Sequence, residues 1–546
     1  MEFTVKQTSS LVKIRGRAVG DVPTLTSKTL LAGQSFHYQL ALEADGNAEL
    51  SVTVDSPLAA YISLYAVKNG VMDLPTYPDA DEDYLTKEPG LMPDLLLPLA
   101  LEGGGIRLRG EAGAVWVQLS LPEDIKAGSY PVTLTVFDGW TQKKEVTLTV
   151  KVLPASLPAQ KTIFTQWFHV DCIADAHGVK IYSEAHWALI EKYMKMAVQG
   201  GINMLLTPVI TPPLDTKIGG TRPCTQLVDI EKEGDTYRFD FSRLCRFLDL
   251  AQGCGIRYFE ISHLFSQWGL RATPNIRVRE NGQESYLFGW HVEATAPAYR
   301  TFLSQFLPTL CDCLRARGVL DRTYFHISDE PTEEHLDAYR YAHDLIRAHI
   351  GDCPTLDALS DIAFFERGLV PTPVTATDHV APFLARSIEN QWVYYCCLQG
   401  AGVGNRFLAM PSYRNRILGL QIYKYDIKGF LHWGYNFYYN QFSRRPVNPY
   451  LTTSADHAFP SGDPFSVYPG KDGPHPSLRL FVFREALEDI EVCRLLERYV
   501  GRDAVIEMID TAAGAPLTFS DYPRSDTFTP DLIERMLEKI ATFAQE

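Results

Sequence analysis

Residues Tyr324-Phe-His-Ile-Ser-Asp-Glu-Pro331 are the starting point for every other inference about this chain. The first four, 324–327, suit a buried strand, and Pro331 ends the strand because it has no backbone N–H to donate. Asp329 and Glu330 therefore lie at the carboxyl end of a predicted inner strand. In a (β/α)8 barrel, catalytic residues collect at that end of the strands.

The same residues also fit the start of a helix. Residues 331–334, Pro-Thr-Glu-Glu, suit a first helical turn with Asp329 or Glu330 near its cap. A three-residue motif such as Asp-Glu-Pro has low specificity. The organisation of the rest of the chain has to decide between the two interpretations.

The bulk composition is that of an ordinary soluble globular protein, with 46% hydrophobic and 21% charged residues. At 546 residues, two to four domains are expected. The net charge of −15 argues against nucleic acids and anionic membrane surfaces as partners, and it says little about neutral glycans.

The N-terminus shows no basic segment followed by an apolar one, so no secretory signal is visible and a cytoplasmic protein is expected unless a signal has been removed. No apolar run of about 18 residues predicts a membrane span. The ten cysteines form no paired CxxC motif and are expected to be free thiols.

Residues 1–155 predict an all-β sandwich. Residues 115–121 alternate between apolar and polar side chains, and residues 128–139 lead through a turn into 144–152 as a hairpin. The proline-rich segment 70–97 predicts a long surface excursion. The sandwich itself is expected to serve for packing or as an accessory surface that faces sugar.

Residues 153–159 are punctuated by prolines and mark a domain boundary. Beyond it, strands alternate with helical runs, which is typical of a parallel α/β sheet or barrel. No nucleotide-binding glycine motif follows the first strand, so no cofactor is expected. We predict a (β/α)8 TIM barrel over 160–500 and a C-terminal helical segment over 501–546 packed on it. The eight strand candidates are 163–169, 202–207, 256–262, 323–328, 354–359, 373–377, 392–397 and 428–434.

The carboxyl ends of these strands carry polar and aromatic residues that could form one site. Long insertions at 208–239 and 263–295 should lie on the same face. Adjacent carboxylates suit a proton donor beside an orienting carboxylate better than an inverting pair, which needs roughly 6.5–9.5 Å between its acids. No GxSxG, HxH or HExxH motif supports a serine nucleophile or a metal. The strand-end residues are Trp167, His169, Glu260, His263, Asp329, Glu330, Asp378, His379, Tyr394, Tyr395, Trp433 and Asn436.

Four stretches give the chain a resemblance to a known family. They are FHISDEP (325–331), GFLHWGYNFY (429–438), GDPFSVYPG (462–470) and PSLRLFVFREALEDIEVCRLL (476–496). In this order, behind an all-β region, they resemble glycoside hydrolase family 123, the β-N-acetylgalactosaminidases. The resemblance covers nearly the whole chain and is stronger from 163 to 500.

The resemblance implies retaining hydrolysis assisted by the substrate, in which the 2-acetamido oxygen of the sugar forms an oxazolinium intermediate. Asp329 would orient and stabilise the acetamide nitrogen. Glu330 would protonate the leaving oxygen and then deprotonate water. A neighbouring anion raises the pKa of a carboxylic acid, so the pair can help to set its own protonation. The expected partner is an oligosaccharide or glycolipid glycan with terminal β-N-acetylgalactosamine (GalNAc).

Strand-end position alone suggests the remaining contacts. We expect Trp433 to form the floor of the sugar site and Tyr394 or Tyr395 to bond the acetamide carbonyl. Trp167, Asn436, His263 and Asp378 are further candidates for substrate binding. Two alternatives stay open: a two-carboxylate glycosidase in which Glu260 or Asp378 partners Glu330, and a glycan-binding protein without activity. The preference for gluco or galacto sugars, the linkage, the aglycone and the oligomeric state also stay open.

Overall fold

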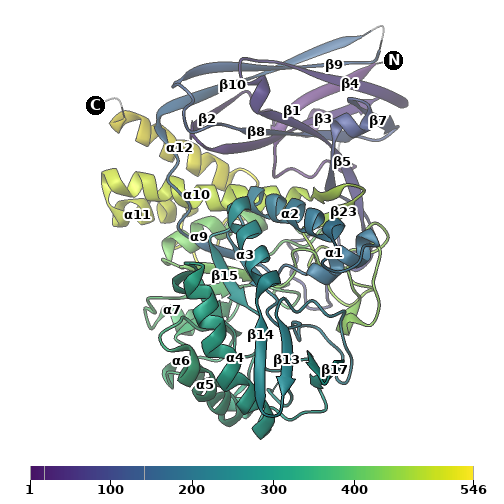
Figure 1. Ribbon diagram of the computed structural model, residues 1–546. Helices are drawn as coiled ribbons and strands as arrows, with labels where there is room; N and C mark the ends of the chain where they lie inside the picture. The colour runs from purple at the N-terminus through teal and green to yellow at the C-terminus, as the bar shows by residue number, and fades with distance from the viewer. Residues whose placement is uncertain (1, 17–18, 140–141, 268, 545–546) are drawn as a thin grey trace.

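The structure is a computed structural model that describes residues 2–16, 19–139, 142–267 and 269–544. A region of two β-sheets lies at one end of the molecule and a parallel barrel lies at the other (Figure 1). Two C-terminal helices, α10 (Leu478–Val500) and α12 (Phe528–Phe543), run between them. Within the described residues, none of the helices is both long and apolar enough to cross a membrane.

The N-terminal region consists of two five-stranded sheets that share one hydrophobic core. Strand alternation explains the arrangement: Val115 and Val117 face this core, whereas Trp116 between them packs toward Phe481 of α10. One sheet has the order β1 (Phe3–Ser9), β3 (Ser35–Ala44), β8 (Gly113–Ser120), β5 (Ile62–Met72) and β6 (Gly90–Pro98). The other has the order β2 (Ser27–Ala32), β10 (Lys143–Ser156), β9 (Gly128–Phe137), β4 (Asn47–Asp55) and β7 (Gly105–Arg109).

The segment 70–97 is a surface excursion only in its middle part. Its ends belong to β5 and β6, whereas residues 73–89 form no strand and are mostly exposed or partly exposed. Some side chains of this middle part contact the barrel region. Asp81 pairs with the buried Arg414 at 2.8 Å, and the Tyr84 hydroxyl donates to the Gly400 carbonyl at 2.7 Å. The prolines between β5 and β6 prevent strand pairing, but the polar side chains of this segment still form hydrogen bonds and ion pairs with residues of the barrel region.

The eight predicted barrel strands are all present and all pair in parallel. Seven are shorter than predicted, and the strand predicted at 373–377 keeps its length but begins one residue earlier. The sheet is nearly closed: its two end strands meet only at the bridge between Phe325 and Thr355 and at a 2.9 Å bond from Phe325 N to Pro354 O. In spatial order the strands are β18 (Thr323–Phe325), β15 (Tyr258–Ile261), β12 (Met204–Thr207), β11 (Ile163–Gln166), β22 (Gly429–His432), β21 (Trp392–Tyr394), β20 (Thr372–Ala376) and β19 (Leu356–Leu359).

The helices around this barrel are unequal, which departs from the regular (β/α)8 expectation. Only single turns, α6 (Ala363–Glu366) and α7 (Ala381–Leu384), follow β19 and β20, because the connections there are short. Ser183 caps α2 by accepting from His186 N at 3.3 Å. The longer helices are α1 (Val170–His177), α2 (Glu184–Gln199), α3 (Ser242–Cys254), α4 (Pro297–Ala316), α5 (Leu336–Ile350) and α9 (Leu418–Lys424), and the single turn α8 (Tyr413–Arg416) precedes α9.

The two long insertions after β12 and β15 come together in one four-stranded sheet of order β14-β13-β16-β17. Strands β13 (Asp229–Glu233) and β14 (Thr236–Asp240) come from the first insertion. Strands β16 (Ile276–Glu280) and β17 (Gln283–Phe288) come from the second. Each insertion thereby gains a rigid support for the loop residues that it carries.

The C-terminal helices join the two regions. Helix α10 packs on α8 and α9 and also contacts β3 and β6, while α12 contacts α10 and β2 (Figure 1). On α10, Glu485 pairs with Arg416 at 3.0 Å and accepts from the Ser10 hydroxyl at 2.9 Å. The last helices, α11 (Arg502–Ala513) and α12, therefore extend a layer that already begins at Leu478.

Candidate active site

The chain between β18 and the next helix makes a strained turn at Glu330. This residue has a φ of +45°, a region that non-glycine residues seldom adopt. Its N–H donates to the Ala358 carbonyl of β19 at 3.1 Å. Helix formation begins only after Thr332, whose side chain forms a capping box with His335. The helix-start interpretation therefore places the cap too early: the cap is Thr332, and the two acids lie before it in the turn. Such strain is often retained where function requires it.

A cavity of about 160 Å³ opens at this turn. It lies at the carboxyl ends of the barrel strands, and five of the nine predicted site residues line it. These are Trp167, Asp329, Glu330, Tyr394 and Trp433. The other lining residues are His169, Leu214, Asp215, Gln267, Ala358, Cys396, Cys397, Leu431 and Phe459.

The two adjacent carboxylates have different surroundings. Asp329 is buried and accepts from Gln267 Nε2 at 2.9 Å, and Glu330 Oε1 accepts from the Tyr394 hydroxyl at 2.7 Å. Burial, together with the charge of Glu330, raises the pKa of Asp329 to about 7. The two neighbours thus differ in their hydrogen-bond donors, an amide for Asp329 and a phenol for Glu330.

Two tryptophans form walls of the cavity. Trp433 Nε1 donates to Asp463 Oδ2 at 2.8 Å, and Trp167 Nε1 donates to Glu260 Oε1 at 2.7 Å. Both indole N–H groups thus bond buried carboxylates. With their orientation fixed in this way, the aromatic faces can contact an apolar face of a sugar ring.

Tyr395 and Asn436 do not lie in the cavity, contrary to the expectation from their strand-end positions. Tyr395 is fully buried on the opposite side of its strand, where its hydroxyl bonds Asn415 Oδ1 at 3.2 Å. Asn436 is also fully buried, and its amide bonds both the N–H and the carbonyl of His169, at 2.9 and 3.0 Å. Its hydrogen bonds hold backbone, and its burial keeps it out of reach of a sugar in the cavity.

His263 and Asp378 are likewise outside the cavity. His263 is fully buried and stacks on His326 with ring centroids 4.1 Å apart. Asp378 is partly exposed and accepts from Gln399 Nε2 at 3.0 Å and from its neighbour His379 at 2.8 Å. Both residues follow barrel strands, but the chain turns away from the cavity before it reaches them.

Two polar residues of the cavity were not among the strand-end candidates, and a third was a strand-end candidate to which no substrate contact was assigned. Gln267 and Asp215 lie on the two insertions, and no local pattern distinguishes them from other loop residues. Asp215 Oδ2 accepts from Phe442 N at 2.9 Å, and burial raises the pKa of Asp215 to about 6. The third is His169, whose Nε2 donates to the Trp433 carbonyl at 2.9 Å; burial and Arg222 lower the pKa of His169 to about 3, so the ring is neutral.

Neither carboxylate considered as an alternative partner for Glu330 reaches the cavity. Glu260 is fully buried and accepts from Thr165, Trp167 and His326. Asp378 lies outside. Among the described residues, Asp215 is the one further carboxylate that lines the cavity.

Comparisons with known proteins agree on one family. A family model described as the glycoside hydrolase 123 catalytic domain matches residues 167–496. A solved family 123 glycoside hydrolase from Clostridium perfringens, described for glycolipid glycan hydrolysis, has a similar fold. It is 15% identical, with a TM-score of 0.76 over 100% of this chain and 98% of that chain. At this identity, the likeness shows the fold alone.

Other solved structures are more distant. A GH5 xyloglucanase from Bacteroides ovatus is 9% identical, covering 89% of this chain and 100% of its own, with a TM-score of 0.29. A glycoside hydrolase from Bacteroides vulgatus, described as a putative one, is 10% identical, covering 86% and 79%, with a TM-score of 0.30. None of the curated proteins compared with the chain matches it.

Proposed function

The chain belongs to glycoside hydrolase family 123, and from this premise we propose that it is a retaining exo-β-N-acetylgalactosaminidase that uses substrate-assisted catalysis. The observation that carries the proposal is the pair of adjacent carboxylates in one cavity, one bonded by an amide donor and the other by a phenol. Two unlike acids side by side suit two unlike tasks on a 2-acetamido sugar.

In the first step, the acetamide oxygen attacks the anomeric carbon as the glycosidic C–O bond breaks. Glu330 gives its proton to the departing oxygen, and Asp329 accepts a hydrogen bond from the acetamide N–H. An oxazolinium ring results, with its positive charge next to Asp329. In the second step, Glu330 takes a proton from water, which opens the ring at the anomeric carbon and restores the β configuration.

The raised pKa of Asp329 is compatible with this role. An N–H donor favours the ionised form of a carboxyl group, and Gln267 already supplies one. The acetamide N–H supplies a second donor when substrate binds, and the oxazolinium charge then favours the anion further. Asp329 thus becomes most firmly ionised at the point where its charge stabilises the intermediate.

The size and lining of the cavity support exo action on a single terminal sugar. At about 160 Å³ it is smaller than the roughly 300–1,000 Å³ of sites for drug-sized ligands. Trp433 offers an aromatic face on which the sugar ring can stack. Asp215, on the insertion that follows β12, offers an acceptor for a sugar hydroxyl. We propose terminal β-linked GalNAc, on an oligosaccharide or glycolipid, as the substrate.

The test of this proposal is a pair of aryl glycosides. The β-GalNAc compound should be cleaved with a kcat/KM about 10³-fold or more above that of the β-galactoside, because only the former carries the intramolecular nucleophile. A GalNAc thiazoline, which mimics the oxazolinium ring, should inhibit competitively. Equal cleavage of the two glycosides would mean that the acetamide takes no part. The β-N-acetylglucosaminide, measured alongside, decides between galacto and gluco sugars.

The adjacent tyrosines provide a matched pair of variants. Tyr394→Phe should lower kcat/KM about 10- to 100-fold, because Glu330 loses the hydrogen bond that holds it toward the cavity. Tyr395→Phe removes the same atom from the opposite side of the strand and should leave kcat/KM within about twofold of the wild type. Equal losses in the two variants would contradict the role given to Tyr394.

A second candidate function is a two-carboxylate glycoside hydrolase in which Asp215 partners Glu330. It is favoured by the position of Asp215 in the cavity and by the pKa of about 6 that burial gives it. The same aryl glycosides separate the two proposals, since a two-carboxylate enzyme does not need the acetamide. Asp215→Asn should then abolish cleavage of the β-galactoside, whereas under the leading proposal it should chiefly raise KM.

A further inference from the structure

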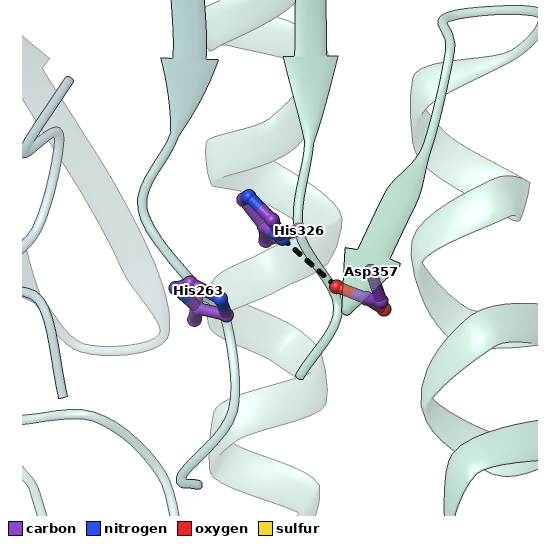
Figure 2. Close-up of side chains that lie close together, drawn as sticks. All are labelled: His263, His326 and Asp357. Atoms are coloured by element: carbon purple, nitrogen blue, oxygen red, sulfur yellow. Dashed lines mark hydrogen bonds and ion pairs between the residues drawn. The ribbon is translucent and has the colours of Figure 1, made fainter. Parts of the chain in front are cut away.

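A cluster of charged groups lies fully buried behind the cavity. Glu260 of β15, His326 after β18 and Asp357 of β19 have no exposed surface. His326 lies between the two carboxylates, with Nε2 at 2.5 Å from Glu260 Oε1 and Nδ1 at 3.0 Å from Asp357 Oδ1. Figure 2 shows the bond from His326 to Asp357 and the neighbouring His263, on three adjacent strand ends.

The charge state of this cluster follows from its geometry. Both ring nitrogens of His326 face carboxylate oxygens, which accept hydrogen bonds only, so both nitrogens must carry protons. Burial alone lowers the pKa of His326, but Glu260 and Asp357 together raise it to about 10. The stacked His263 is neutral, because burial and the charge of His326 hold its pKa well below the usual value.

A metal ion does not fit this cluster. His263, His326 and Asp357 have atoms able to bind a metal within 4.8 Å of one another. However, the lone pairs of imidazole lie in the ring plane, and the two rings are stacked with planes only 21° apart. Their nitrogens therefore point side by side rather than toward one ion, and those of His326 are already engaged.

The cluster holds the backbone that carries the catalytic pair. Asp357 accepts from the N–H groups of Ile327 at 3.2 Å and Ser328 at 3.3 Å, the two residues directly before Asp329. The Tyr339 hydroxyl of α5 donates to the same carboxylate. Together with the bond from Glu330 N to Ala358 O, these contacts tie the strained turn to β19, where strand pairing is reduced to one bridge.

At its other end the cluster reaches a wall of the cavity. Glu260 accepts from Trp167 Nε1 at 2.7 Å and from the Thr165 hydroxyl at 2.9 Å. The chain of contacts from Trp167 through Glu260, His326 and Asp357 to residues 327–328 thus spans strands β11, β15, β18 and β19. A displacement of any member would therefore shift both Trp167, which forms a wall of the cavity, and the turn that carries Asp329 and Glu330.

Burial has the largest effect on the pKa of Asp329, and the groups that act on it besides are Glu330, Gln267, His326 and Asp357. Gln267 and His326 favour its anion, whereas Glu330 and Asp357 oppose it. His326 is the one cation in this set.

We propose that Glu260, His326 and Asp357 form a positioning network for the catalytic pair. Asp357 fixes the peptide that carries Asp329 and Glu330, and the His326 imidazolium holds the two buried carboxylates together while favouring the anionic form of Asp329. The network rests on the proposed function, because it assigns the ionised form of Asp329 to the working enzyme. None of its three members touches the sugar.

The kinetic test compares two substitutions that each remove one negative charge. Asp357→Asn should lower kcat about 10- to 100-fold with little change in KM, because the catalytic turn loses its anchor. In this variant the decline of kcat/KM at acidic pH, here called the acidic limb, should move to lower pH by up to roughly one unit. The reason is that the variant lacks the Asp357 anion, which opposes ionisation of Asp329. Glu260→Gln is the matched control: it keeps His326 paired with Asp357 and should give a smaller kcat loss and a smaller shift.

A purely structural role predicts a different result. Both variants would then lose thermal stability and active fraction to similar extents, with the acidic limb unmoved, and this outcome overturns the proposal. Should Asp357→Asn fail to fold, Tyr339→Phe weakens the hold on the same carboxylate without changing charge, and kcat should fall several-fold. Unchanged kcat in Tyr339→Phe would count against the network.

A stability measurement without activity completes the test. In the wild type, the folded-state pKa of His326 is raised from 6.5 to about 10, so its contribution to the free energy of unfolding is fully present below about pH 6.5 and is lost as pH rises toward 10. The His326→Gln variant cannot titrate at this position, so its loss of stability should be largest below about pH 6.5 and should shrink as pH rises toward 10. A variant whose loss of stability is the same at every pH refutes the ion-pair assignment.

Failure of the network and failure of the proposed function give different results. The pair of aryl glycosides, measured on the wild type alone, decides whether the acetamide takes part. The comparison of Asp357→Asn with Glu260→Gln, on whichever glycoside the wild type cleaves, decides whether the network positions the turn.

Discussion

Glu330→Gln should lower kcat/KM by about 10²- to 10⁴-fold for GalNAc glycosides with a poorly acidic leaving group, the range that general acid catalysis supplies. Glutamine keeps the shape of the side chain and its contact with Tyr394, but it has no proton to give to the departing oxygen. The loss should shrink for an aryl leaving group of low pKa, which departs without protonation. Steady-state rates across a series of aryl β-GalNAc substrates measure this dependence.

The control for this series is Glu334→Gln. Glu334 is exposed, four positions further along the chain, and the substitution makes the same change in net charge. Its kcat/KM should equal that of the wild type on every substrate. A Glu330→Gln enzyme that loses activity equally on good and poor leaving groups would contradict the assignment of Glu330 as the acid, and it would point to a defect in folding or binding.

The barrel strands were predictable because each is a short, buried run between polar segments. Each of the eight predicted ranges overlaps a strand, including the one that precedes Asp329 and Glu330. Seven of the eight lengths were overestimated, as at 392–397, where the strand is only Trp392–Tyr394. The residues that directly follow such strands include cysteines and look apolar in the sequence, so the predicted ranges extend over them. In the structure they belong to loops.

Which strand-end residues face the cavity follows in part from alternation. Leu431 and Trp433 line the cavity, whereas His432 between them faces Asp463 and Arg406. The same alternation places Tyr394 inside and Tyr395 outside. It fails a few residues beyond a strand, where the chain bends, and for this reason His263, Asp378 and Asn436 were misplaced.

The loop residues of the cavity could not have been predicted from local pattern. Asp215 is held by the N–H of Phe442, which is 227 positions away in the chain. Gln267 reaches Asp329 across 62 positions. Each position depends on contacts between distant segments, and a single sequence carries no periodic signal for such contacts. For the same reason, the contact between the buried residues His326 and Asp357 could not be predicted from the sequence.

Asp329→Asn should lower kcat by about 10²- to 10³-fold on 2-acetamido substrates, a loss typical of removing one preorganised electrostatic contact to the transition state. The nitrogen of the acetamide becomes positively charged as the oxazolinium ring closes, and asparagine offers it no negative charge. One orientation of the new amide would even turn its own N–H groups toward the substrate N–H. Affinity for the GalNAc thiazoline should fall with kcat, since the inhibitor carries the ring of the intermediate.

The pH dependence of kcat/KM separates this role from a loss of packing, because kcat/KM reports groups of the free enzyme. Asp329 must be ionised to act, and burial together with Glu330 raises its pKa to about 7. The kcat/KM of the wild type should therefore decline as pH falls below about 7. Asn cannot titrate, and the low residual activity of Asp329→Asn should therefore lose this acidic limb. Gln267→Leu should move the limb to higher pH instead, because Asp329 loses the donor that favours its anion. An Asp329→Asn enzyme of full activity, or one that keeps the wild-type limb, would remove Asp329 from the mechanism and leave the acetamide without a stabilising partner.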